Sequence, residues 1–170
     1  MTAYVALLRA VNVGGTGKLP MSDLKAICEA AGYANVTTYI ASGNVVFTSK
    51  DPAKKVQARL EAGLEAYAGK PVGVLLRTAE EMAAILAANP FPKASPTFTV
   101  TIFLDAPPPK DTLKAVVGQA NEEIRLGKRE FYVFYPDGQG RSKLKIPAAV
   151  AGTARNMNTV AKLAEMAAST

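Results

Sequence analysis

The chain opens with an apolar run, YVALLRAV at residues 4–11, which leads directly into a glycine-rich segment, NVGGTGK at residues 12–18. The run is short and carries β-branched valines, which favours a buried central β-strand. After the glycines, Pro20 stands where a helix would begin, and apolar residues then recur at helical spacing until Gly32. The opening of the chain therefore predicts a strand, a loop and a helix.

The alternation of strands and helices continues to residue 77. Two strand-like runs flank Ser42-Gly43-Asn44, a turn sequence in which Gly43 and Asn44 tolerate positive φ, and together they predict a hairpin. The elements expected are strands at residues 36–40, 45–48 and 72–77, and a helix from Pro52 to Gly69 with Val56, Leu60, Leu64 and Tyr67 on its apolar face. Residues 3–77 thus follow the order βαββαβ, which is the ferredoxin-like order.

The second half repeats this order incompletely. Three prolines within residues 89–96 mark the expected boundary, so that residues 1–90 form one ferredoxin-like half and residues 91–170 a second, incomplete one within a compact unit. The elements expected are a helix begun by Thr78, strands at residues 98–104, 123–126 and 131–135, a helix after Pro107–Pro109 that carries Leu113, Val116 and Val117, and a last helix from Asn156. The sequence therefore predicts an α+β fold of two βαββαβ-related halves, with helices packed on antiparallel sheet.

The amino-acid composition excludes several kinds of catalytic and metal site. The 170 residues contain no histidine and one cysteine, Cys28. Histidine-based nucleophile pairs, histidine acid–base catalysis and most zinc or iron sites are therefore excluded, and we expect neither a metal nor a cofactor. No apolar run reaches the roughly 20 residues that a membrane helix needs, and the first residues have no basic region, so we expect a cytoplasmic protein without a membrane partner.

Positive charge is concentrated in two parts of the chain. The formal net charge is +6, made up of +4 in residues 1–77, −2 in residues 78–109 and +4 in residues 110–170. Two basic parts favour an anionic partner, either a small molecule or nucleic acid, although solvated surfaces often carry such charge without binding anything.

Polar clusters at strand or helix ends supply the candidate ligand-binding residues. Glycines let backbone N–H groups point together, and Arg and Lys add the charge that favours phosphate or carboxylate. A helix start such as that expected at Asn156 also favours an anion, although Thr153 or Asn156 could equally be there as a cap. The candidates are Arg9, Asn12, Gly14, Gly15, Lys18, Ser42, Asn44, Arg141, Lys143, Arg155 and Asn156, which we expect to converge on one anionic ligand.

Alternatives to simple ligand binding stay open. A nucleoside triphosphatase is rejected, because Asn12 and Leu19 occupy the places of the leading glycine and the following hydroxyl of a P-loop. The leading hypothesis is a binding protein for an anionic small ligand or for nucleic-acid phosphate. The alternatives are an enzyme that acts without histidine on a phosphorylated or carboxylated substrate, and a structural module that forms homo-oligomers through a sheet edge or a helix face.

The same motifs resemble one bacterial family. Residues 9–21, the SGNVVF run at residues 42–47, Gly140–Lys143 and residues 153–163 are similar in content and order to the family DUF1697, a domain of unknown function, and the likeness covers nearly the whole chain. Family members usually read RGINVGG at the start, where this chain has Ala10 and Val11, and they often carry Trp where Met157 stands. The resemblance implies a duplicated α+β fold related to the ferredoxin-like arrangement, and it implies no activity.

Overall fold

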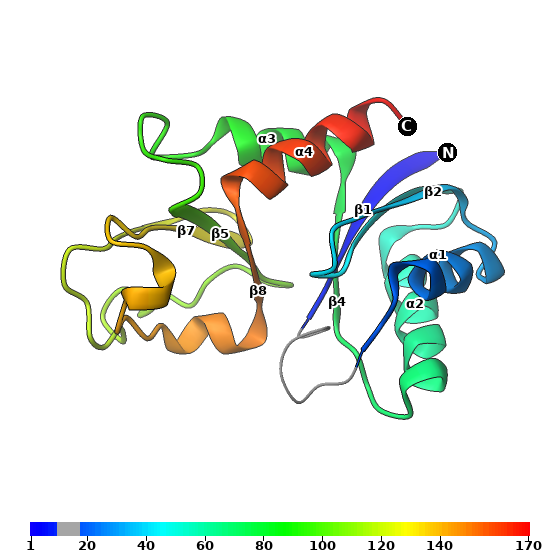
Figure 1. Ribbon diagram of the computed structural model, residues 1–170, viewed down its shortest axis with the longest axis horizontal. Coiled ribbons are helices and arrows are strands. Elements are labelled where there is room, and N and C mark those ends of the chain that lie inside the picture. Colours follow the sequence, from blue (N-terminus) through cyan, green and yellow to red (C-terminus); the bar gives the residue numbers. More distant parts are fainter. Residues whose placement is uncertain (10–17) are drawn as a thin grey trace. The chain divides into compact units, whose positions relative to one another are not determined.

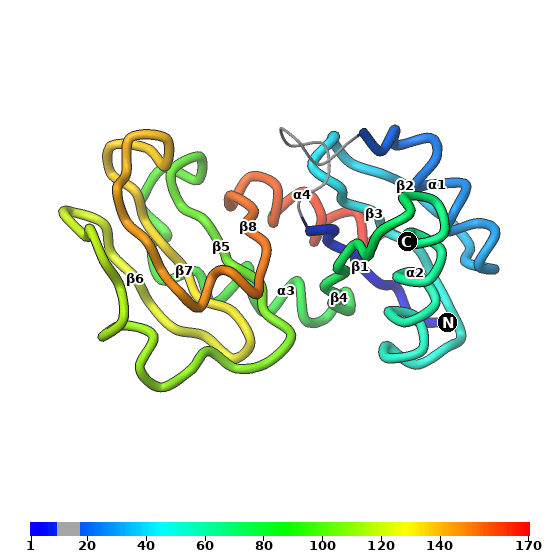
Figure 2. The backbone as a smooth tube through the Cα atoms, turned by 90° about the horizontal axis from the view of Figure 1, so that it is seen from below, coloured from blue at the N-terminus to red at the C-terminus, as the bar shows by residue number. Residues whose placement is uncertain are grey.

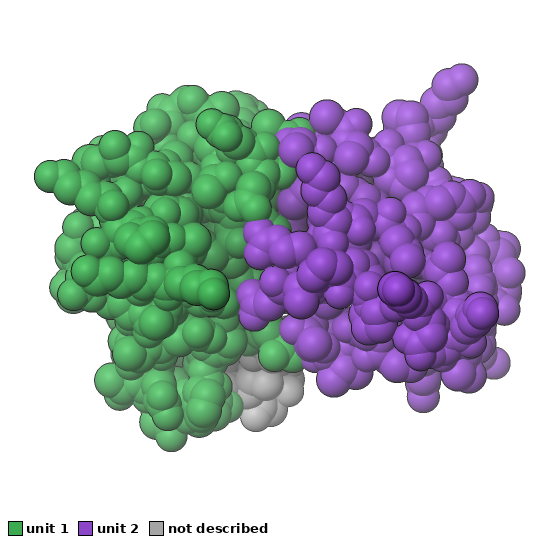
Figure 3. All heavy atoms as spheres, turned by 180° about the vertical axis from the view of Figure 1, so that it is seen from behind, with its two compact units in different colours: residues 1–83, 163–170 green, residues 84–162 purple. Residues whose placement is uncertain are grey.

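The structure, a computed structural model, describes residues 1–9 and 18–170. These described residues form two units, one made of residues 1–83 with 163–170 and the other of residues 84–162 (Figure 3). Within the described residues, each unit is built on a four-stranded antiparallel sheet (Figure 1). The predicted fold class, α+β with two halves on antiparallel sheets, is confirmed.

The first unit follows the order βαββαβ. Its elements are β1 Thr2–Leu8, α1 Met21–Ala30, β2 Ala34–Tyr39, β3 Asn44–Ser49, α2 Ala53–Ala68 and β4 Val74–Thr78, and α3 Ala79–Ala87 follows. The sheet order is β2-β3-β1-β4, so that β1 is paired along both of its edges. α1 and α2 lie together beside this sheet (Figure 1).

The core of the first unit lies between the sheet and the helices α1 and α2. Leu24 and Cys28 of α1 are fully buried in it, together with Leu60 of α2. The ring of Tyr33 stacks on the ring of Phe47 in β3, with the ring centroids 4.5 Å apart. Apolar residues at helical spacing on α1 and α2 therefore meet alternate residues of the strands, as the sequence pattern predicts.

The helix boundaries follow from the residue types expected to set them. Pro20 and Pro52 directly precede α1 and α2, and Gly69 ends α2 in the left-handed region at a φ of 72°. Thr78 Oγ1 accepts a hydrogen bond from the Glu81 N–H at 3.1 Å, and the Glu81 carboxylate accepts one from the Thr78 N–H at 2.9 Å. This capping box confirms that Thr78 precedes a helix.

Tyr67 departs from the prediction for α2. It is exposed, and its hydroxyl donates a hydrogen bond to Asp23 Oδ2 at 2.6 Å instead of entering the core. A tyrosine ring carries a hydroxyl that needs a polar partner, and the carboxylate of Asp23 supplies one at the surface. The apolar face of α2 therefore ends at Leu64.

The second unit has the sheet order β6-β7-β5-β8 (Figure 2). Its elements are β5 Thr99–Phe103, β6 Glu123–Leu126, β7 Glu130–Phe134 and β8 Thr153–Asn156, and α4 Met157–Ala168 follows. Short 3₁₀ segments, Gln139–Arg141 and Pro147–Ala151, lie between β7 and β8. One core cluster of this unit joins β5, β6 and β7 to residues of the loops; its buried members include Val100, Ile102, Ile124, Phe131, Val133, Tyr135 and Ile146.

The prediction of a helix after Pro107–Pro109 is wrong. Residues 110–114 form turns, and Leu113 and Val117, expected on an apolar helix face, are 48% and 63% exposed. The prolines before it lack N–H donors, and the segment ends at Gly118, whose φ of 74° lies outside the helical region. The Val117 N–H donates to the Lys145 carbonyl oxygen at 2.9 Å, and the Lys145 N–H donates back to Val117 at 2.7 Å. Pairing with a distant loop thus takes the place of the helix.

The buried thiol of Cys28 gives a first prediction. Burial, with a smaller effect of the Glu29 charge, raises the pKa of this thiol from 9.0 to about 12. Because the folded state holds the neutral thiol, native protein at pH 8 should resist alkylation by iodoacetamide, whereas urea-unfolded protein should react fully. Mass spectrometry of the two samples measures this, and equal labelling rates would contradict a sealed site.

The same pKa shift has a consequence for stability. Above about pH 9 the thiol ionises in the unfolded state, while the folded state keeps it neutral up to about pH 12. The free energy of unfolding should therefore fall between these two pH values, by up to about 1.4 kcal/mol per pH unit. The Cys28→Ala variant removes this thiol and should lose less stability over the same interval. Urea unfolding of both proteins at pH 8 and pH 10.5 compares the two losses.

Candidate functional site

Candidate residues of the first unit meet at one end of its sheet. The Leu8 N–H donates to the Gly43 carbonyl oxygen at 2.9 Å, and the Arg9 N–H donates to the Gly73 carbonyl oxygen at 2.9 Å. The side chain of Arg9 crosses Gly73 so closely that a Cβ there would lie 3.0 Å from Arg9 Cδ. The end of β1 is thereby fixed between the β2–β3 turn and the start of β4. Lys18 is exposed, and Asn12, Gly14 and Gly15 lie outside the described residues.

The β2–β3 turn is held by Asn44, which is fully buried. Its side-chain Nδ2 donates to the Tyr39 carbonyl oxygen at 2.9 Å and to Ser42 Oγ at 2.8 Å. Gly43 has the expected positive φ of 90°, but the second such residue is Ile40, with a φ of 49°, and not Asn44. Asn44 therefore serves the turn itself, and the strained conformation falls on a β-branched residue that is 50% exposed.

A small polar cavity of about 170 Å³ lies in the second unit, and it brings Arg141 and Lys143 together. The other polar side chains around it are those of Asn121, Glu122, Tyr135 and Asp137. Gly118 and Ala120, which precede β6, and Gly138, which follows β7, complete its wall. The cavity therefore lies where the loop before β6 meets the loop after β7.

Both carboxylates of the cavity accept hydrogen bonds from its own wall. Glu122 is buried, and its Oε1 accepts the Ala120 N–H at 2.7 Å while its Oε2 accepts the Ser142 hydroxyl. These bonds, led by that of Ser142, lower the pKa of Glu122, so it is ionised at neutral pH. Asp137 Oδ2 accepts the Asn121 side-chain N–H at 2.8 Å. The bonds of Glu122 thus hold the 138–144 segment against residue 120.

The two cations of the cavity, unlike its carboxylates, are not bonded to the wall that the structure describes. Over residues 1–9 and 18–170, the side chains of Arg141 and Lys143 make neither a hydrogen bond nor an ion pair, and both residues are exposed. Tyr135 is only 6% exposed, yet its hydroxyl has no hydrogen-bond partner in the described part of the chain. Burial, and then the Glu122 charge, raises the pKa of Tyr135, so the hydroxyl keeps its proton. Two cations and one hydroxyl can therefore serve a ligand.

Sequence reasoning missed Tyr135, Glu122 and Asp137. Tyr135 ends an apolar run and was expected only as a strand residue, and Glu122 lies in a segment without a recognisable motif. Their role depends on the meeting of residues 118–122 with residues 135–143, which no local pattern shows. Of the three, only Asp137 could have been found from the sequence as a residue of the site, because it opens the DGQGRSKLK stretch that contains Arg141 and Lys143.

Arg155 and Asn156 lie at the end of β8 and not in a helix. Arg155 is buried, and its guanidinium donates to Thr153 Oγ1 at 2.8 Å and to the Ala154 carbonyl oxygen at 2.9 Å. Burial lowers the pKa of Arg155 to about 10, which leaves it positive at neutral pH. Asn156 Oδ1 accepts the Thr159 N–H at 3.0 Å and so caps α4. The capping interpretation of Asn156 is therefore the one that its contacts fit.

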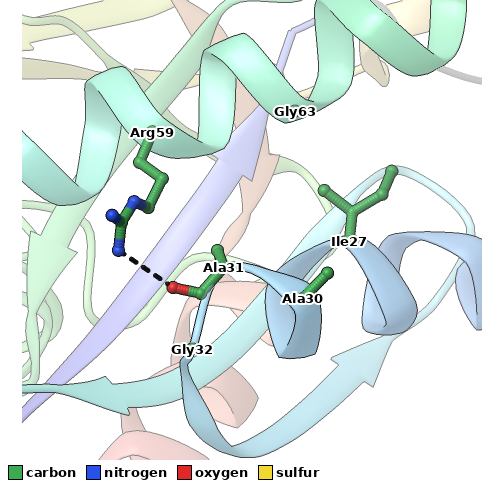
Figure 4. Close-up of a pocket in the computed structure, with 6 residues that line it drawn as sticks. All are labelled: Ile27, Ala30, Ala31, Gly32, Arg59 and Gly63. Carbon is green, nitrogen blue, oxygen red and sulfur yellow. Dashed lines mark hydrogen bonds between the residues drawn. The ribbon is translucent and has the colours of Figure 1, made fainter.

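A second hollow, of about 470 Å³, lies between α1 and α2 (Figure 4). Arg59 points across it and donates to the Ala31 carbonyl oxygen at 3.2 Å, and its guanidinium also lies 3.9 Å from Asp51. Ile27 and Gly63 form its apolar side. Because its one cation is occupied, this hollow offers an anion less than the cavity of the second unit does.

Two further findings concern the described residues as a set. In residues 1–9 and 18–170, no three Cys, Asp or Glu side chains gather closely enough to hold a metal ion. None of the helices described there combines the length and apolar character needed to cross a membrane.

Fold and site together define a two-sheet α+β protein with a small polar cavity in its second unit. The structure of the conserved bacterial protein SP0830 from Streptococcus pneumoniae is similar, with a TM-score of 0.82 and 24% identity over 98% of each chain, which shows the fold. The chain belongs to the family described as Protein of unknown function (DUF1697), whose model matches residues 1–132. This confirms the resemblance seen in the sequence. No curated protein matches the chain.

The strained turn gives a second prediction. Ile40→Gly should raise the free energy of unfolding relative to Ile40→Ala by about 1 kcal/mol, because a side chain at a φ of 49° is penalised and glycine is not. Urea unfolding of the two variants measures the difference. The opposite order, with alanine more stable as in an ordinary strand, would show that residue 40 is not left-handed.

The close approach of residues 118 and 143 gives a third prediction. A Cβ on Gly118 would overlap the Lys143 carbonyl oxygen, and its φ is positive, so Gly118→Ala should destabilise the protein by about 2 kcal/mol or more. Gly140→Ala is the matched control, since a Cβ there meets nothing within 4 Å, and it should change stability by about 0.5 kcal/mol or less. Thermal unfolding compares them, and equal effects would contradict the packing of this loop.

Proposed function

We propose that this protein binds an anionic group, the phosphate or carboxylate of a small ligand or a nucleic-acid phosphate, at the cavity of the second unit. Arg141 and Lys143 supply the charge. The observation that carries the proposal is that these cations line a cavity without a side-chain partner in the described residues, while the carboxylates beside them accept hydrogen bonds from the wall.

The chemistry of the two cations suits such a ligand. A guanidinium presents paired N–H donors that match two oxygens of a phosphate or carboxylate, and an ammonium adds a compact charge. The loop that carries both is fixed at its base, because Val117 and Lys145 pair through their backbones and Ser142 is held by Glu122. Donors on a fixed loop lose less conformational entropy when they bind.

The size of the cavity favours a small ligand over a polymer. Pockets for drug-sized ligands measure roughly 300–1,000 Å³, and this one measures about 170 Å³. It can hold one phosphate or carboxylate with a small attached group. Arg9, Lys18 and Ser42 belong to the first unit, and we retain them as proposed anion contacts there.

The fourth prediction tests the two cations. Inorganic phosphate is titrated into the full chain by calorimetry at low salt, and Arg141→Ala and Lys143→Ala should each weaken binding about tenfold, the value of one charged hydrogen bond. Lys145→Ala is the matched control, because it removes an equal charge two residues away that does not line the cavity. Equal weakening by all three variants would mean that only net charge matters.

A nucleic-acid ligand is distinguished by its salt dependence. Binding of a DNA oligonucleotide through several phosphates should fall steeply with salt, with a log–log slope that reports the number of contacts. Binding of inorganic phosphate at one cavity should show a shallow slope. Absence of DNA binding at low salt, with phosphate binding retained, leaves the small ligand.

A further inference from the structure

We propose that the ligand of the Arg141 cavity is a small dipolar molecule, which carries an ammonium group beside its anionic group, as amino acids and phosphorylated amines do. This inference rests on the proposed function, since it assigns the anionic group to Arg141 and Lys143. It adds a second subsite, made by Tyr135 and Asp137.

The first step is the hydroxyl of Tyr135. The residue is 94% buried, and within the described ranges its hydroxyl has no hydrogen-bond partner. Among the described residues no fully buried side-chain oxygen lacks a hydrogen-bond partner, so the Tyr135 hydroxyl is reached by water, whereas a phenylalanine there would offer no polar atom to a ligand. Tyr132, in the strand β7 that leads to Tyr135, shows how a tyrosine hydroxyl is usually satisfied within the protein. Its hydroxyl donates to the Ile85 carbonyl oxygen at 3.1 Å. The hydroxyl of Tyr135 is therefore available to a ligand inside the cavity that it lines.

The second step is the difference between the two carboxylates. Both oxygens of Glu122 accept hydrogen bonds from the wall. Asp137 is exposed and uses one oxygen for Asn121, and its other oxygen has no partner in residues 1–9 and 18–170. One carboxylate oxygen and one phenolic oxygen are thus acceptors without a donor. An ammonium group carries three N–H donors and no acceptor, and it satisfies both.

The third step is charge. The described side chains around the cavity include two cations, Arg141 and Lys143, and two anions, Glu122 and Asp137. A purely anionic ligand would gain from the cations but would be repelled by both carboxylates. A dipolar ligand can place its negative group at the cations and its positive group at Asp137. The volume of about 170 Å³ limits that ligand to a few non-hydrogen atoms.

The experiment compares probes that differ only by an ammonium group. Phosphoethanolamine is compared with ethyl phosphate, and glycine with acetate, by calorimetric titration of the full chain. In the pair that binds, the dipolar probe should bind at least about tenfold more tightly than the simple anion, as expected for one charge-assisted hydrogen bond. Equal affinity within a pair overturns the dipolar inference and leaves the proposed function standing.

Variants separate the two subsites. Asp137→Asn keeps the shape and can still accept from Asn121, so it should abolish the preference for the dipolar probe without weakening phosphate binding. Asp111→Asn, the same charge change at an exposed residue that does not line the cavity, should leave the preference intact. An unchanged preference in Asp137→Asn overturns the second subsite.

Tyr135→Phe separates binding from folding. Since its hydroxyl has no partner in the described structure, the thermal midpoint should stay the same or rise while the dipolar probe binds more weakly. Tyr132→Phe, which loses the bond to Ile85, should lower the midpoint instead. A lower midpoint for Tyr135→Phe, with probe binding unchanged, overturns the role of this hydroxyl. If no probe of either kind binds the wild-type chain, the proposed function falls, and this inference falls with it.

Discussion

The pairing of one central strand along both of its edges is the constraint on which each sheet depends. In the first unit β1 has β3 on one side and β4 on the other, and Leu7 faces both Asn44 and Leu75. A strand held on both edges cannot shift its register without moving buried side chains to the wrong face. The exit of the chain at Leu8 and Arg9 is therefore fixed against Gly43 and Gly73.

The second sheet has the corresponding arrangement, with β5 between β7 and β8, but what surrounds it differs. In the first unit the helices α1 and α2 bury one face of the sheet. In the second, the segments between the strands are turns and 3₁₀ segments in the described residues, and they pack Ile146 and Leu144 against the core of the sheet. Polar bonds also hold them, from Ser142 to Glu122 and between Val117 and Lys145. A polar cavity results where these loops meet.

The sequence predicted those parts of the fold that local patterns determine. The helix α2 and its ends follow from apolar spacing, Pro52 and Gly69, and β1 follows from its apolar run. The helix expected at Leu113 to Val117 failed because its amphipathic spacing extends over barely two turns and its partner, Lys145, is distant in sequence. The strand expected to reach Ile40 ends at Tyr39, because Ile40 has a φ of 49° in the turn, and no local pattern of a β-branched residue indicates that conformation. Arg141 and Lys143 were visible as a charge pattern, whereas Tyr135 and Glu122 became visible only through long-range packing.

The two arginines of the second unit that were candidates show why residue type is not enough to define a site. Arg155 is buried, its guanidinium donates to Thr153 and Ala154 of its own strand, and the loss of water around it lowers its pKa to about 10. Arg141 is exposed and, among the described residues, its side chain donates to no side chain or carbonyl. A donor already bonded to protein gains little from a ligand, because it must first break those bonds, while a solvated donor exchanges only water. Arg141 is therefore the better ligand residue, although both were equally basic in the sequence.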